Sequence, residues 1–152
     1  SVSFSWLDCS LSIAFFVSVF WVHYELDLIS LRNTPEWLIN SAFLDVYSGH
    51  LRRAESKYSR AFKQEVPVEF ITEAEEFVGD VLHQHKDRPQ LHFSAGILAL
   101  HRGDYLLATQ EFEAFLRDHP NLSQWEVTVG QKYLGQARTR LASSSHQPQK
   151  SA

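Results

Sequence analysis

Histidines and carboxylates gathered between residues 73 and 92 are the side chains best suited to chemistry in this chain. His83, His85 and His92 lie close together in the sequence, and an imidazole nitrogen is a common ligand of zinc. Alternate residues on a helix point about 200° apart, so His83 and His85 cannot bind one ion together while they are helical. Histidines at a helix end instead favour solvent and the negative end of the helix dipole. We therefore expect no metal site.

Acid–base or nucleophilic catalysis has little support in the sequence. The four carboxylates between residues 73 and 80 could supply a catalytic pair, but their spacing is typical of the solvated face of a helix. Cys9, the only cysteine, lies beside Asp8 and an apolar run, and both features raise a thiol pKa. The chain has no P-loop, G-x-G-x-x-G, C-x-x-C, H-E-x-x-H or G-x-S-x-G motif. We expect no enzymatic activity and no cofactor.

Length and charge narrow the remaining classes of protein. The chain has 152 residues, which suits one domain with a real hydrophobic core. Its net charge is −4 and its isoelectric point is about 6.0. A nucleic-acid-binding domain usually carries a basic surface, so we expect no nucleic-acid partner.

The stretch 89–120 predicts two amphipathic helices joined by a tight turn. We expect the chain to reverse at Gly103, because glycine tolerates the positive φ that a helix end often needs. Asp104 can cap the second helix, and Pro120 ends it. The apolar residues of that helix follow a three-to-four spacing that predicts one buried face: Tyr105, Ala108, Phe112, Phe115 and Leu116.

The rest of the chain also predicts helices. Thr34, Pro35 and Glu36 form a strong helix start, with a cap, a proline at the first helical position and an acid in the first turn. Gly49 separates two helices in the same way as Gly103. The further ranges expected to be helical are 35–48, 50–64, 68–86 and 121–142. We expect residues 143–152 to be a disordered tail.

The two hairpins resemble the tetratricopeptide-repeat family, which has a period of about 34 residues. The resemblance rests on six residues of the second hairpin: Gly96, Gly103, Tyr105, Ala108, Phe112 and Pro120. In the first hairpin the corresponding residues are Ala42, Gly49, Ala54 and Tyr58. Gly49 and Gly103 are 54 positions apart, so one extra helix, 68–86, must lie between the repeats. The resemblance implies an all-α, irregular helical-hairpin solenoid of about six to seven helices over residues 32–142.

Residues 1–31 form an apolar N-terminal segment that precedes the expected repeat domain. Its uncharged run, 9–24, lies between Asp8 and Glu25 and is shorter than the roughly 20 residues of a membrane-spanning helix. Three interpretations remain open: a helix buried in the protein, a membrane anchor, or an uncleaved signal region. Membrane contact through residues 11–24 is therefore an expectation.

The resemblance also implies a binding groove, because the first helix of each tetratricopeptide repeat lines the concave face. The residues carried over to the groove are Ile39, Phe43, Val46 and Tyr47 in the first repeat, and Phe93, Ile97, Leu100 and His101 in the second. Such an apolar groove would suit an amphipathic or apolar helix of another protein. The alternative is that the chain fills its own groove, with the segment 11–31 as the candidate.

We therefore expect a non-enzymatic scaffold or adaptor that docks another protein. The run 112–120, FEAFLRDHP, resembles bacterial envelope members of the family that attach to a membrane at the N-terminus. Membrane association in a bacterial envelope or an organelle is expected over a freely soluble state. The alternative function is a structural subunit of a membrane protein complex. The sequence does not indicate an oligomeric state.

Overall fold

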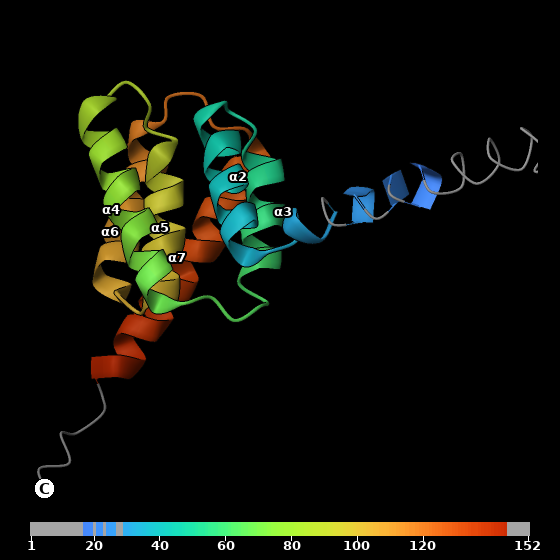
Figure 1. Cartoon of the computed structure of the whole chain (residues 1–152). Coiled ribbons are helices and arrows are strands. Elements are labelled where there is room, and N and C mark those ends of the chain that lie inside the picture. The colour runs from blue at the N-terminus through green and yellow to red at the C-terminus, as the bar shows by residue number, and fades with distance from the viewer. Residues whose placement is uncertain (1–16, 20, 23, 27–28, 146–152) are drawn as a thin grey trace, which may run out of the picture.

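The computed structural model describes residues 17–19, 21, 22, 24–26 and 29–145, and the described chain is helical without strands. The predicted all-α fold is confirmed. Six helices make up the body of the molecule (Figure 1): α2 (Pro35–Tyr47), α3 (Leu51–Ala61), α4 (Val68–Gln84), α5 (Leu91–Arg102), α6 (Tyr105–Asp118) and α7 (Gln124–Ser145). Residues 1–16, 20, 23, 27 and 28 of the predicted N-terminal segment 1–31, and residues 146–152 of the predicted tail, lie outside the described residues.

Two of the connections are equivalent helical hairpins, α2–α3 and α5–α6. Gly49 has φ +79° and Gly103 has φ +90°, and these are the only left-handed residues in the described chain. In each hairpin the residue after the glycine donates its N–H to a carbonyl five residues earlier. These bonds join His50 to Asp45 over 2.7 Å and Asp104 to Ala99 over 2.9 Å. The reversals predicted from the two glycines are confirmed.

Side-chain caps start the helices that the sequence marked most clearly. The Thr34 hydroxyl accepts from the Trp37 N–H over 3.4 Å, with Pro35 as the first residue of α2. The Asp104 carboxylate accepts from the Leu107 N–H over 3.0 Å at the start of α6. Both caps were predicted, and each satisfies a backbone donor that the helix itself leaves unpaired.

Helix α5 is the centre of the fold. It packs against α4 on one side and α6 on the other, and it also contacts α2 and α7. Phe93 of α5 is fully buried, and its ring centroid lies 6.1 Å from Phe112, 5.5 Å from Phe115 and 5.8 Å from Tyr133. This aromatic cluster joins α5, α6 and α7 into one hydrophobic core.

Close helix packing depends on two glycines. A Cβ on Gly96 would lie 2.8 Å from the Phe112 ring, so only glycine lets α6 lie this close to α5. A Cβ on Gly130 would lie 2.8 Å from Leu116 and 3.0 Å from Phe115. Gly130 therefore lets α7 lie close to α6, as Gly96 does for α5 and α6.

The C-terminal helix is longer than predicted. Helix α7 continues to Ser145, three residues beyond the expected end at Ala142, so residues 143–145 are helix rather than tail. Its Tyr133 hydroxyl donates to Glu55 of α3 over 3.0 Å. This contact ties the last helix back to the first hairpin.

Candidate functional site

The residues predicted to line one groove lie in different environments. Five of them are buried in the core: Ile39, Phe43, Val46, Phe93 and Ile97. Tyr47 and Leu100 are half-buried, and His101 is exposed. The structure does not bring all eight residues together along one open face. Their role in binding a partner remains a prediction, and it now concerns only the residues that a partner could reach.

Helix α4 covers much of the surface that the resemblance assigned to a partner. Its Phe77 ring meets the Phe43 ring edge-on at 5.2 Å. In the loop after α4, the Arg88 guanidinium donates to the Tyr47 carbonyl over 2.8 Å and lies 4.1 Å from the centre of the Tyr47 ring. The chain thus covers this face with its own extra helix, and not with the described part of the segment 11–31.

A narrow apolar crevice remains open between α2 and α4, and we call it the α2–α4 crevice. Its volume is about 190 Å³. Phe77 on its edge is 55% exposed, whereas Phe43 on its wall is 9% exposed. The residues that line it are Ile39, Asn40, Phe43, Tyr58, Phe70, Glu73, Ala74, Phe77, Val78 and Leu98. Two predicted groove residues, Ile39 and Phe43, therefore line this crevice, although Ile39 is only 1% exposed.

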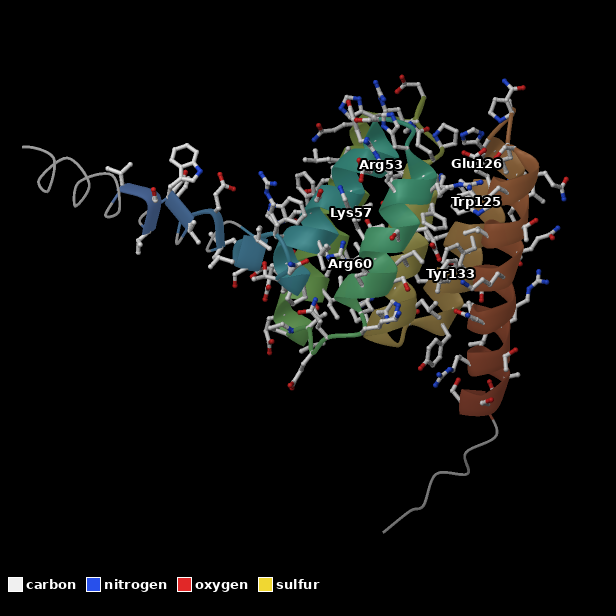
Figure 2. All side chains as sticks on the ribbon, turned by 90° about the vertical axis from the view of Figure 1, so that its right-hand side faces the viewer. Arg53, Lys57, Arg60, Trp125, Glu126 and Tyr133 are labelled. Carbon is white, nitrogen blue, oxygen red and sulfur yellow. The ribbon has the colours of Figure 1, made fainter. Side chains whose placement is uncertain are left out.

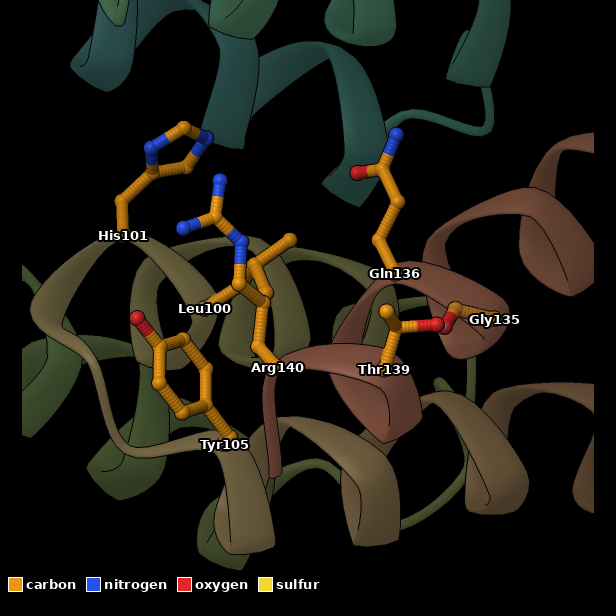
Figure 3. Close-up of a pocket in the computed structure, with 7 residues that line it drawn as sticks. All are labelled: Leu100, His101, Tyr105, Gly135, Gln136, Thr139 and Arg140. Atoms are coloured by element: carbon orange, nitrogen blue, oxygen red, sulfur yellow. The ribbon is translucent and has the colours of Figure 1, made fainter. Parts of the chain in front are cut away.

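A second cleft, of about 650 Å³, lies where α5, α6 and α7 meet, and Figure 3 shows it. Leu100 and His101 come from the end of α5, and Tyr105 from the first turn of α6. Gly135, Gln136, Thr139 and Arg140 of α7 complete the lining. The lining residues include one fixed positive charge, on Arg140, and no carboxylate. The cleft therefore has no acid–base pair of the kind used in hydrolysis.

His101 in this cleft is held in its neutral form. Its ring stacks on the Phe62 ring with the centroids 3.6 Å apart and the planes 3° apart. Burial of this face disfavours the imidazolium ion and lowers the pKa of His101 to about 4. At neutral pH the ring therefore acts as an aromatic contact between α3 and α5 rather than as a charge.

Stability is expected to fall as the pH decreases from about 6.5 to about 4, because unfolded His101 takes up a proton at the higher pH. The loss should be on the order of 1 kcal/mol, since the exposed edge of the ring is screened by water. Urea unfolding at several pH values measures it. The variant His101→Gln should lose less stability than the wild type over this range. Equal losses of stability in the wild type and in His101→Gln would contradict the lowered pKa of His101.

A third exposed feature is the described part of the N-terminal segment. Its described residues are helical, and the large apolar ones are all exposed: Val17, Val19, Trp21, Val22, Tyr24, Leu26, Ile29 and Leu31. Figure 1 shows this part leaving the helical body near the start of α2. Within the described ranges, no helix has the length and apolar character needed to cross a bilayer.

The turn between this segment and α2 is fixed by polar contacts from α3 and the residues that follow it. The Arg60 guanidinium donates to the side-chain oxygen of Asn33, and the Gln64 amide donates to the Asn33 carbonyl over 2.9 Å. The Asn33 amide donates to the Ile29 carbonyl over 3.0 Å. These bonds hold Asn33 against the end of α3, and in Figure 1 the described segment leaves the helical body on the side of α3.

Other groups named by the sequence have structural partners. Glu75 of α4 forms an ion pair with Arg102 at 2.7 Å, although burial still raises the Glu75 pKa. The Nδ1 atom of His92 lies 2.6 Å from the Oε2 atom of Glu111. In the part of the chain that the structure describes, no group of three or more His, Cys, Asp or Glu residues could hold a metal ion.

Sequence reasoning missed the α7 side of the cleft. Gln136 and Arg140 are exposed, as the helix pattern predicts, but the pattern does not say that Leu100 and His101 lie opposite them. It also missed the buried bond from the Tyr58 hydroxyl to Ser94, which is 2.9 Å long. A hydroxyl on an otherwise apolar face was the only available signal.

Comparison of the chain with protein-family models, with curated proteins and with solved structures finds no match.

Proposed function

We propose that this protein is a non-enzymatic interaction scaffold, held at a membrane by its apolar N-terminal segment and docking a helix of another protein in the α2–α4 crevice. The body of the scaffold is a pair of tetratricopeptide-like hairpins with one extra helix, α4, between them. The left-handed glycines Gly49 and Gly103, with matching backbone bonds after them, support this description. The close packing of Gly96 on Phe112 supports it as well.

The observation that carries membrane association is the exposure of apolar side chains on opposite sides of the described N-terminal residues. Residues two positions apart on a helix point about 200° apart, so Val17, Val19 and Trp21 alternate between opposite sides. All three are exposed. Apolar side chains on opposite sides of a helix need to be covered by lipid or by protein. A groove on one partner would cover only one side, whereas a bilayer covers every side.

The proposed occupant of the α2–α4 crevice is an apolar or amphipathic helix of a different protein. The contacts of Asn33 with Arg60 and Gln64 hold the root of the segment at the end of α3. The described segment leaves the body on that side in Figure 1, which argues against its described residues as the occupant. A volume of about 190 Å³ suits one or two large apolar side chains. The exposed residues Leu44 and Phe77 would extend the contact along α2 and α4.

Binding to vesicles tests the membrane half of the proposal. Val22→Asp in the full chain should weaken binding to phosphatidylcholine vesicles roughly tenfold to a hundredfold, because a carboxylate in the hydrocarbon is costly. Val68→Asp at the start of α4 is the matched control. Val68 is 55% exposed and Val22 is 56% exposed, so neither change disturbs the core. Flotation of the two variants measures the difference. Equal binding by both would refute membrane insertion of the segment.

The alternative function is a structural subunit of a membrane complex. It draws support from the same exposed helix, since neighbouring transmembrane helices could cover all of its sides. A fixed stoichiometry with the same partners through purification in mild detergent would favour the subunit. A partner that exchanges during purification would favour the adaptor.

A further inference from the structure

Positive charge is concentrated on α3 in a protein that is acidic overall. Between residues 51 and 63 there are five basic residues and one acidic residue, Glu55, whereas the whole chain has a net charge of −4. The basic residues are Arg52, Arg53, Lys57, Arg60 and Lys63. The remainder of the chain is therefore more acidic than the net charge indicates. Such asymmetry points to an anionic partner on the side of α3.

The nearby carboxylates neutralise this charge only in part. Glu55 faces α7, where it accepts from the Tyr133 hydroxyl and lies 3.5 Å from Lys132. Asp45 is shared by two cations, with Arg53 at 3.0 Å and Lys57 at 2.6 Å. One carboxylate thus serves two basic side chains.

The basic residues nearest the N-terminal segment have no acidic partner among the described residues. Arg60 is bound to Asn33, whose amide oxygen carries no charge. The ion pairs among the described residues involve neither Lys63 nor Arg32. We call the following set the basic face: Arg32, Arg53, Lys57, Arg60 and Lys63.

The basic face and the N-terminal segment lie on the same side of the molecule. In Figure 1 the described segment leaves the helical body on the side where α3 lies. Figure 2 looks at that side and shows Arg53, Lys57 and Arg60 in a row along α3. Trp37 lies beside them, with the Lys57 ammonium 5.7 Å from the centre of its ring. Tryptophan is enriched where a protein meets the interface of a bilayer.

We propose that the basic face binds the anionic headgroups of the bilayer that receives the N-terminal segment. This inference rests on the proposed membrane association and names the lipid class that the domain recognises there. The bonds from Arg60 and Gln64 to Asn33 hold the root of the segment against the end of α3. Insertion of the segment therefore brings α3 to the membrane surface. Each cation close to an anionic surface strengthens binding about fivefold at moderate salt.

The test compares vesicles of phosphatidylcholine alone with vesicles that also contain about 30% phosphatidylserine. Wild-type full chain should bind the anionic vesicles more tightly, and the difference should shrink between about 0.1 M and about 0.5 M salt. The variant Arg32→Gln/Arg60→Gln/Lys63→Gln should lose roughly a hundredfold in affinity for the anionic vesicles. It should keep wild-type affinity for phosphatidylcholine vesicles.

Two further variants keep the test decisive. Arg32→Gln/Lys63→Gln leaves the bond from Arg60 to Asn33 intact and should still lose roughly twentyfold to thirtyfold. Lys86→Gln/Arg117→Gln/Arg138→Gln removes the same charge outside the basic face, and it should change affinity less than about threefold because distant charges are screened. Circular dichroism confirms that each variant is folded.

The possible failures are distinguishable. Equal affinity of the basic-face variant and the control for anionic vesicles would overturn the lipid inference, while binding to phosphatidylcholine would still support insertion of the segment. A wild-type chain that shows no preference for anionic vesicles would overturn it too. Failure to bind either vesicle would overturn both the inference and the proposed membrane association.

Discussion

Phe93→Ala is expected to lower the free energy of unfolding by about 3–5 kcal/mol, the usual loss when a buried phenylalanine is truncated. Phe93 is fully buried, and its ring contacts Phe112, Phe115 and Tyr133 from two other helices. Its removal leaves a cavity at the centre of the core that rigid aromatic neighbours cannot close. Urea unfolding followed by circular dichroism measures the loss.

Phe77→Ala is the matched control for this prediction. The same side chain is removed, but from a position that is 55% exposed on α4. We expect a loss below about 1 kcal/mol, since exposed positions contribute little. Similar losses at Phe93 and Phe77 would mean that the two side chains are not buried to different extents, as their exposed fractions require. The assignment of core and crevice would then be wrong.

The same pair of residues shows how docking must be tested. A change at Phe93 destabilises the whole domain, so a loss of partner binding there would not identify a binding surface. Phe77→Ala keeps the fold and removes an exposed part of the α2–α4 crevice. A partner helix that docks in the crevice should lose affinity with this variant.

Gly96→Ala is expected to destabilise the protein although alanine is the better helix former. The new Cβ would lie 2.8 Å from the Phe112 ring, which is fully buried and has no room to move. Overpacking of this kind typically costs about 1–3 kcal/mol, and the gain of about 1 kcal/mol in helix propensity offsets only part of it. Thermal and urea unfolding should both report a net loss.

Gly79→Ala should change the free energy of unfolding in the opposite direction to Gly96→Ala. Gly79 lies inside α4, and a Cβ there would meet no atom within 4 Å. The substitution should therefore stabilise the protein by roughly 0.5–1 kcal/mol through helix propensity alone. The difference between the two variants isolates the cost of overpacking. Two variants of equal stability would contradict the close approach of α5 and α6.

Local signals in the sequence account for most of the helices and their ends. Gly49 and Gly103 predicted the two reversals because only glycine adopts positive φ at little cost. Thr34 and Asp104 predicted two helix starts because their side chains bond to backbone donors within the same turn. The end of α7 was predicted three residues too early, because Ala142, Ser143, Ser144 and Ser145 give no stop signal.

The arrangement of the helices was harder to predict, because it depends on contacts between distant parts of the chain. The apolar stripe of α4 predicted a buried face but not which helix it would cover. Phe93 fits a groove or a core equally well by its spacing alone. The cleft beside Leu100 and His101 needs Arg140 of α7, which lies 39 residues after His101 in the sequence.

The N-terminal segment was open to more than one interpretation for the same reason. Its composition indicates that its apolar side chains must be covered, but composition does not identify the cover. The polar bonds of Asn33 with Arg60 and Gln64 fix the turn from which the described residues leave the body. Those partners follow Asn33 by 27 and 31 residues, so no local pattern contains them.

The measurement that tests this account most directly compares the fragment 32–145 with the full chain. The fragment keeps α2 to α7 and both bonds to Asn33, and it lacks the exposed apolar segment. The account predicts a soluble, helical fragment that unfolds cooperatively, with a free energy of unfolding close to that of the full chain in detergent. A fragment that aggregates, or that unfolds without a cooperative transition, would mean that the N-terminal segment belongs to the core and would contradict the account.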